Sequence, residues 1–171
     1  MYCSRVSHPV KSVDSLEEIP PLFDWGRKYL SDPLKGKLDY LAHPSLLEKR
    51  SDFLLPFGDC DDHALFYGVK LKISGLADRV WFCIYTMADK NKRLSGHAVC
   101  VFTKNGSLFW CDYRHPNKLG RATKEKQWDF AMVSASVYGK RPIAAARWEI
   151  MGVEGTTDTP IFGPVEANTE Y

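Results

Sequence analysis

Long apolar runs are missing from this chain. No stretch approaches the roughly 20 consecutive apolar residues that a membrane helix requires. The first nine residues also lack the apolar segment of a secretion signal. We therefore expect a protein made without export and without a membrane partner, located in the cytoplasm. Association with a virus particle is the alternative.

The chain has little excess charge of either sign, with 23 Lys and Arg against 21 Asp and Glu. Its basic residues cluster only at 90–93 and over 114–126, both in expected loops. Nucleic-acid-binding surfaces combine a basic stripe with stacking aromatic side chains, and no such stripe is present. We therefore expect no nucleic-acid partner.

Paired cysteine motifs are missing as well. The five Cys residues are an odd number, and none belongs to a CxxC pair. In a chain made without export, we expect them to be reduced thiols. Cys83, Cys100 and Cys111 lie in apolar stretches, where a cysteine acts as a small hydrophobic residue, and Cys3 lies near the N-terminus. Only Cys60 has a setting that calls for another explanation.

What the chain does have is enough apolar residues, 44% of 171, for one domain with a full core. We expect a domain over 1–154, with a helical part broken by prolines over about 1–57 and a core over about 58–154. Residues 155–171 are polar and contain Pro and Gly, which predicts a C-terminal tail. This tail is the expected contact for a protein partner or a larger assembly.

The core region changes its hydrophobic periodicity at Gly75. Before it, apolar residues from 61 to 73 predict a mostly buried helix that ends at Ser74-Gly75. After it, β-branched and aromatic residues predict strands over 80–87, 97–103 and 108–113, with a further strand over 144–153. Asn105-Gly106 predicts a type I′ hairpin turn, because both central residues of that turn need positive φ.

Cys60 stands at the start of the predicted helix, in the run Gly58-Asp59-Cys60-Asp61-Asp62-His63. A thiol is nucleophilic as a thiolate, and a helix N-terminus lowers the thiol pKa through its dipole and unpaired amides. The neighbouring Asp residues oppose ionisation through their negative charge. A catalytic Cys60 therefore requires a positive partner, for which an imidazolium is the usual choice.

His97 is the predicted partner, and Asp112 the residue that orients it. With Asn105-Gly106 as a two-residue loop, Val99 lies opposite Asp112, which makes His97 and Asp112 diagonal neighbours on one face. Such neighbours are separated by roughly 7–8 Å, within reach of an Asp side chain. A carboxylate on one ring nitrogen leaves the other for the thiol. The alternative is that the two residues only satisfy each other's hydrogen bonds in the core.

A zinc site is an alternative role for the same residues. Cys60-x-x-His63 and His97-x-x-Cys100 together have the residue types of a Cys₂His₂ set. Residues three apart on a strand point to opposite faces, however, so His97 and Cys100 are not expected to share one ion.

A calcium site is the second metal alternative. Asp59, Asp61 and Asp62 lack the alternating ligands and closing Glu of an EF-hand loop. A weaker calcium site on these three carboxylates stays open, and we otherwise expect no metal and no cofactor.

The motifs resemble the transglutaminase-like cysteine proteinases of bacteria and their phages. The likeness rests on the run around Cys60, on Gly96-His97-Ala98-Val99 and on Asp112-Tyr113, and it extends from about residue 43 to 117. It implies an α+β fold with a papain- or transglutaminase-like core, whose nucleophile begins a central helix packed on an antiparallel sheet. It also implies Cys60 as nucleophile, His97 as general base and acid, and Asp112 as the residue that orients His97.

The resemblance further implies an oxyanion hole made by the backbone amide of Cys60 and a second donor upstream. The second donor is not assigned; Trp25 is a candidate, although an aromatic residue in an amphipathic helix is more often part of the core. His63 departs from the family pattern, in which an aromatic or small residue is commoner, and so alters the surroundings of the nucleophile.

The sequence thus predicts a cysteine peptidase that cleaves an amide or peptide bond of a protein or peptide substrate through a thioester. Acyl transfer to an amine and hydrolysis of cell-wall peptide are alternatives within the same chemistry. A different class of function is a structural component of an assembly, such as a phage particle, that retains the fold.

Overall fold

The computed structural model describes residues 9–19, 28–29, 44, 47, 57–115, 119–122, 140–155 and 158–168. These residues form a mixed α+β fold. None of the helices in this part of the chain is long and apolar enough to cross a membrane. The elements are, in chain order, the 3₁₀ helix η1 (Leu16–Glu18), β1 (Lys28–Tyr29), β2 (Phe57–Gly58), α2 (Cys60–Ile73), β3 (Arg79–Ala88), β4 (Leu94–Lys104), β5 (Ser107–Cys111), β6 (Gly120–Ala122), β7 (Arg141–Val153) and β8 (Pro160–Asn168).

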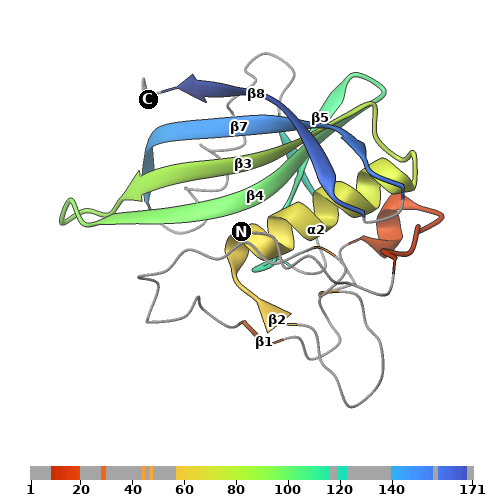
Figure 1. Cartoon of the computed structure of the whole chain (residues 1–171). Coiled ribbons are helices and arrows are strands. Elements are labelled where there is room, and N and C mark those ends of the chain that lie inside the picture. The colour runs from red at the N-terminus through yellow and green to blue at the C-terminus, as the bar shows by residue number, and fades with distance from the viewer. Residues whose placement is uncertain are drawn as a thin grey trace.

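Six of the strands form one antiparallel sheet in the order β6-β5-β4-β3-β7-β8, and α2 lies across one face of it (Figure 1). The short strands β1 and β2 pair separately and in parallel. The strands predicted over 80–87, 97–103, 108–113 and 144–153 correspond to β3, β4, β5 and β7. The hairpin turn is confirmed, because Asn105 and Gly106 have φ of 52° and 69° and Lys104 pairs with Ser107.

The expected polar tail at 155–171 is wrong over most of its length. Residues 160–168 form β8, which pairs with β7 and makes one edge of the sheet. The sequence hides this strand because an edge strand exposes many of its side chains and therefore reads as polar.

Most of the helical segment expected over 1–57 lies outside the described residues. Its described residues include the 3₁₀ turn η1, within the helix expected at 15–19, and the strands β1 and β2. Residues 10 and 11 instead form an extended strap on α2: the Lys70 ammonium donates to the Lys11 carbonyl at 2.5 Å, and the Val10 amide donates to the buried Asp158 carboxylate at 2.5 Å. The strap ties the helix to the loop between β7 and β8.

Helix α2 is buried on all sides, which explains why its sequence is apolar all round. Leu65 and Tyr67 pack in the core against the sheet, and Phe66 packs in a second cluster on the other side of the helix. At its N-terminus the Asp62 carboxylate accepts the Asp59 amide at 3.1 Å, as in a capping box. These contacts fix the position and direction of the first turn of α2.

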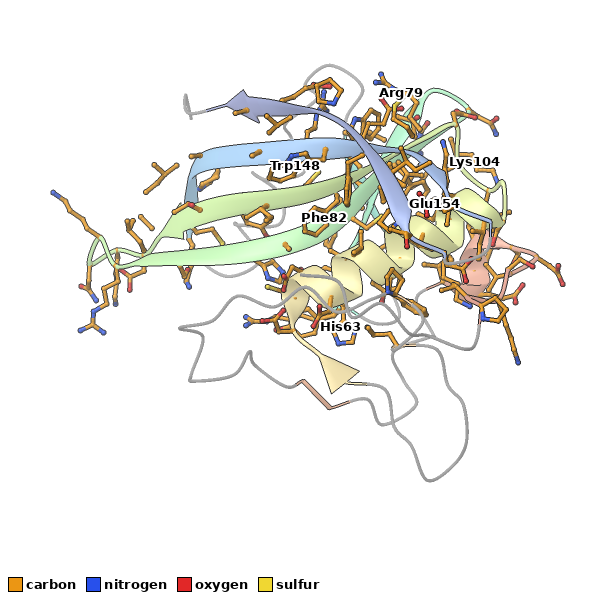
Figure 2. All side chains as sticks on the ribbon, in the orientation of Figure 1. His63, Arg79, Phe82, Lys104, Trp148 and Glu154 are labelled. Atoms are coloured by element: carbon orange, nitrogen blue, oxygen red, sulfur yellow. The ribbon has the colours of Figure 1, made fainter. Side chains whose placement is uncertain are left out.

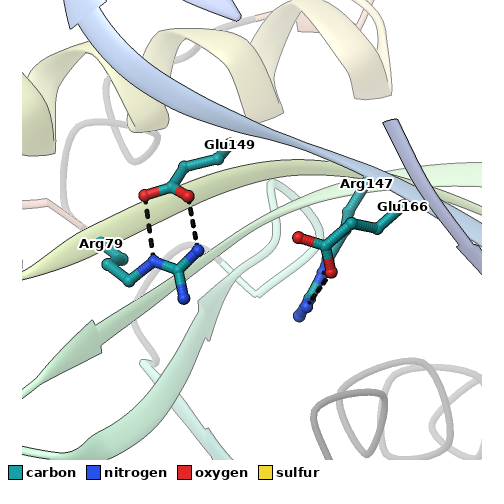
Figure 3. Close-up of polar contacts among 4 residues, drawn as sticks. All are labelled: Arg79, Arg147, Glu149 and Glu166. Carbon is teal, nitrogen blue, oxygen red and sulfur yellow. Dashed lines mark hydrogen bonds and ion pairs between the residues drawn. The ribbon is translucent and has the colours of Figure 1, made fainter. Parts of the chain in front are cut away.

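The opposite face of the sheet carries a second core and a ladder of ion pairs. The Arg79 guanidinium binds Glu149 through contacts of 3.0 and 2.5 Å, and Arg147 binds Glu166 (Figure 3). The guanidinium carbons of Arg79 and Arg147 lie 4.6 and 5.0 Å from the Trp81 ring centroid. The ladder joins β3, β7 and β8 on the side of the sheet that α2 does not cover.

Candidate active site

Cys60 is the first residue of α2 and is partly exposed. Its sulfur accepts a hydrogen bond from the backbone N–H of Ala98 in β4, the residue that follows His97. The helix therefore places the thiol against the backbone of β4 at Ala98, one residue after His97 in the sequence. The sequence placed Cys60 correctly at the N-terminus of the helix, but it could not indicate the Ala98 contact.

His97 and Asp112 are joined by a hydrogen bond of 3.0 Å between Nε2 and Oδ2. Both are almost fully buried, with 4% and 2% of their surface exposed. The register that places them together is the predicted one, with Cys100 opposite Cys111. The second Asp112 oxygen accepts the Arg114 amide at 3.0 Å, which holds the carboxylate in place. Asp112 therefore engages Nε2 of the imidazole and not Nδ1.

Two aromatic rings contact His97, and one of them connects it to a third ring on α2. Tyr85 meets the His97 ring edge-on at 5.6 Å between centroids, and Tyr113 lies on another side at 5.7 Å. Tyr113 in turn stacks on the buried His63, with centroids 5.5 Å apart and ring planes at 17°. Figure 2 labels His63 on α2. These contacts restrict rotation of the imidazole.

Tyr113 was not singled out from the sequence as a site residue. Its position directly after Asp112 was the available signal. The Tyr113 hydroxyl also accepts a hydrogen bond from Arg114 Nε at 2.7 Å, which fixes the plane of its ring. Trp25, the candidate second oxyanion donor, lies outside the described residues.

The pKa of the Cys60 thiol is raised to about 12, so the expected lowering by the helix N-terminus does not prevail. Burial is the largest cause, and the charges of Asp59 and Asp61 add to it. The Ala98 and Cys60 amides act in the opposite direction but are outweighed. The thiol alone is therefore protonated at neutral pH, as the expectation of a required positive partner implies.

The pKa of the Asp61 carboxyl is raised to about 9. Burial is the largest cause, followed by the hydrogen bond to Asp59 and by the charges of Asp59 and Asp62. In the absence of a cation, Asp61 is therefore protonated at neutral pH and shares its proton with Asp59.

Ligand atoms of Asp59, Cys60 and Asp61 all lie within 4.8 Å of one another, a spacing that could hold a metal ion. Asp62, the third residue of the calcium alternative, is not in this group, because its carboxylate caps α2. Within the described residues, the four side chains of the zinc alternative form no such group.

Substituting Asp61 with asparagine tests what this carboxyl does. Because the folded state raises the Asp61 pKa, the stability that its proton provides is lost as pH rises from about 4, the unfolded value, through about 9. In thermal melts without divalent ions, the free energy of unfolding of Asp61→Asn should rise relative to that of the wild type over that pH range. The difference should be about 1–2 kcal/mol at pH 8. The expected difference in free energy is small because water reaches part of the Asp61 carboxyl.

The exposed Asp78 provides the control, since Asp78→Asn should melt in parallel with the wild type. Parallel curves for Asp61→Asn would contradict the raised pKa. If the calcium alternative is correct, excess calcium chloride should stabilise the wild type and fail to stabilise Asp61→Asn.

No protein-family model matches the chain, and no curated protein matches it. Among solved structures, Legionella pneumophila LapG is similar. Its structure is 19% identical with a TM-score of 0.47, and the match covers 76% of this chain and 62% of that one. The EGTA-treated LapG is 19% identical with a TM-score of 0.47, and the match covers 76% of this chain and 60% of that one. The calcium-bound LapG is 20% identical with a TM-score of 0.47, and the match covers 76% of this chain and 62% of that one. The chain thus spans less than two thirds of the length of the LapG chains.

Proposed function

We propose that this protein is a cysteine hydrolase that cleaves an amide or peptide bond of a protein or peptide substrate. The observation that carries the proposal is the convergence at β4: the Cys60 sulfur binds the amide of Ala98, and the preceding residue, His97, is held by Asp112 at 3.0 Å. A helix N-terminus against a sheet edge, with a His–Asp pair beside it, fits a papain- or transglutaminase-like core.

In the proposed reaction, Cys60 gives its proton to Nδ1 of His97 and attacks the substrate carbonyl carbon. The negative charge that develops on the carbonyl oxygen is met by the backbone N–H of Cys60, with a second donor unassigned. The imidazolium, supported by Asp112, then protonates the departing amine and leaves a thioester. Water, deprotonated by His97, hydrolyses the thioester and restores the thiol.

The raised thiol pKa sets a condition on this mechanism. A free Cys60 thiolate is unfavourable because the site is partly buried and contains Asp59 and Asp61. Proton transfer to His97 therefore accompanies the attack or produces a thiolate that the imidazolium stabilises. Acyl transfer to an amine uses the same first half of the reaction and differs only in the acceptor.

Thiol labelling tests the proposal without knowledge of the substrate. With iodoacetamide near neutral pH, Cys60 should be modified faster than the buried Cys83, Cys100 and Cys111. Exposure alone would favour Cys60, so the decisive comparison is with His97→Ala, which should label Cys60 at least roughly tenfold more slowly. Modified residues are identified by peptide mass spectrometry.

A structural role in an assembly is the second candidate, and edge strand β8 favours it. Ile161 and Val165 on β8 are 49% and 55% exposed, and the neighbouring Met151 on β7 is 57% exposed. Exposed apolar side chains on a sheet edge suit contact with another chain. Slow labelling of Cys60 that His97→Ala leaves unchanged would favour this candidate over catalysis.

A further inference from the structure

Strand β4 has one edge that is paired over only part of its length. On the β3 side, pairing runs from Leu94 to Thr103, whereas on the other side β5 pairs only with Cys100–Lys104. No strand among the described residues pairs with 94–99 on that side. Beyond Cys111 the chain leaves the sheet, and the Asp112 carbonyl accepts the His115 amide in a turn. The edge left unpaired by the described strands therefore begins beside the His97–Asp112 pair.

The backbone direction at this edge follows from the contact with Cys60. The Ala98 N–H bonds the Cys60 sulfur, so it points away from β3. In an antiparallel sheet, the N–H and C=O of one residue point to the same side, and residues two apart share that side. Gly96 therefore directs its N–H and C=O to the same edge as the thiol. Gly96 is exposed, and a Cβ built on it would meet nothing within 4 Å.

The same edge leads to a basic hairpin tip formed by residues 89–93. The Asp89 carboxylate accepts the amides of Asn91 and Arg93 at 2.7 and 2.9 Å, and its carbonyl accepts the Lys92 amide at 2.9 Å. The turn is therefore well defined, and its only acid is engaged within it. Lys90, Lys92 and Arg93 are exposed.

Figure 1 shows this hairpin extending past the N-terminal end of α2, where Cys60 lies. Strands rise about 3.3 Å per residue, so the tip lies roughly 15–20 Å along β4 from Ala98. A peptide that lies on this edge with its reacting bond at Cys60 would reach the tip about four to six residues away.

We propose that an extended segment of the protein substrate adds at Gly96 to the edge of β4 that the described strands leave unpaired, and that acidic side chains of this segment, about four to six residues from the cleaved bond, bind the basic tip. The proposal rests on the proposed function, since it places the cleaved bond at Cys60. Main-chain hydrogen bonds to Gly96 fix the substrate strand, and the tip supplies the preference for acidic sequence. The substrate class is thus an extended polypeptide with an acidic cluster beside its cleavage site.

The test uses fluorogenic peptides that carry Glu clusters on one side, the other side or neither side of the reporter bond. The peptide whose Glu cluster lies on the side that reaches the tip should have a kcat/KM at least roughly tenfold above the neutral peptide, the peptide with the cluster on the other side should not, and salt should reduce the difference. The charge reversal K90E/R93E should remove this preference. Lys92 is left in place because its φ of 61° restricts substitution.

Two further variants separate the tip from the edge. Lys104→Glu, at the far end of the same strand (Figure 2), is the charge control and should keep the full preference. Gly96→Pro removes the N–H directed at the substrate and spares the bonding to β3. It should raise KM for all peptides roughly tenfold or more, with circular dichroism to confirm folding.

Binding separates failure of this inference from failure of the proposed function. Cys60→Ala protein is mixed with the labelled Glu-cluster peptide, and anisotropy is measured. If the peptide binds in a way that K90E/R93E abolishes, but the wild type does not cleave it, the hydrolase function is refuted and substrate docking on the β4 edge is supported. If all peptides are cleaved at equal rates and K90E/R93E changes none of these rates, the proposal of docking on the β4 edge is refuted, whereas the hydrolase function is retained.

Discussion

Replacing Cys60 with alanine is expected to abolish hydrolysis, by at least roughly 10⁴-fold in kcat/KM, while the protein stays folded. The residue supplies the nucleophile, and among the described thiols it is the partly exposed one, since Cys83, Cys100 and Cys111 are buried in strands of the sheet. The side chain is partly exposed, so losing its sulfur should change the free energy of unfolding by about 1 kcal/mol or less. Peptide hydrolysis and thermal melts measure the two effects.

Cys60→Ser is the conservative companion, and it should be nearly as inactive because a serine hydroxyl ionises far less readily than a thiol. Cys83 provides the control: it lies on β3 among the side chains of the second core, on the sheet face away from α2. Cys83→Ala should therefore keep its activity. Substantial hydrolysis by Cys60→Ala would refute the thioester mechanism, and unfolding of this variant would point to a structural or metal-binding role.

Asp112→Asn is expected to lower kcat by roughly 10²–10⁴-fold with a smaller effect on KM. The Asp112 carboxylate accepts from Nε2 of His97 at 3.0 Å. Asparagine can occupy the same space, but it carries no charge to support the imidazolium that forms during the reaction. The substitution therefore acts on the transition state more than on substrate binding, and steady-state kinetics distinguish the two.

The control is Asp78→Asn, which changes an exposed carboxylate outside the site and should leave kcat unchanged. Asp112→Ala adds a stability measurement. Without any partner at Nε2, the buried His97 ring should destabilise the fold by about 1–3 kcal/mol. If Asp112→Asn kept full kcat while Asp112→Ala lost stability, the pair would be a hydrogen bond of the core with no part in catalysis.

A feature of the site can be predicted from the sequence when it depends on residues that are close together in the chain. The helix from Cys60 to Ile73 follows from its apolar content and its capping residues, both local properties. The His97–Asp112 pair follows from turn chemistry, because a two-residue loop at Asn105-Gly106 fixes the register of the whole hairpin. Both were therefore predictable from a single sequence.

Other features depend on segments that are distant in the chain. Tyr113 contacts His63 only because α2 packs on the sheet at β4, and β8 is a strand only because β7 offers it a partner. Neither contact leaves a periodic pattern in the sequence. Edge strands and single aromatic contacts are for this reason the features that sequence patterns miss.

The sequence by itself determined which residues carry the proposed chemistry, namely a cysteine at a helix start and a His–Asp pair set by hairpin register. Tertiary structure alone decided the state of the thiol. Burial against the sheet and the charges of Asp59 and Asp61 outweigh the helix N-terminus and the Ala98 amide, and the Cys60 pKa rises to about 12. Desolvation depends on what the rest of the chain packs around a group, and no local pattern of residues records it.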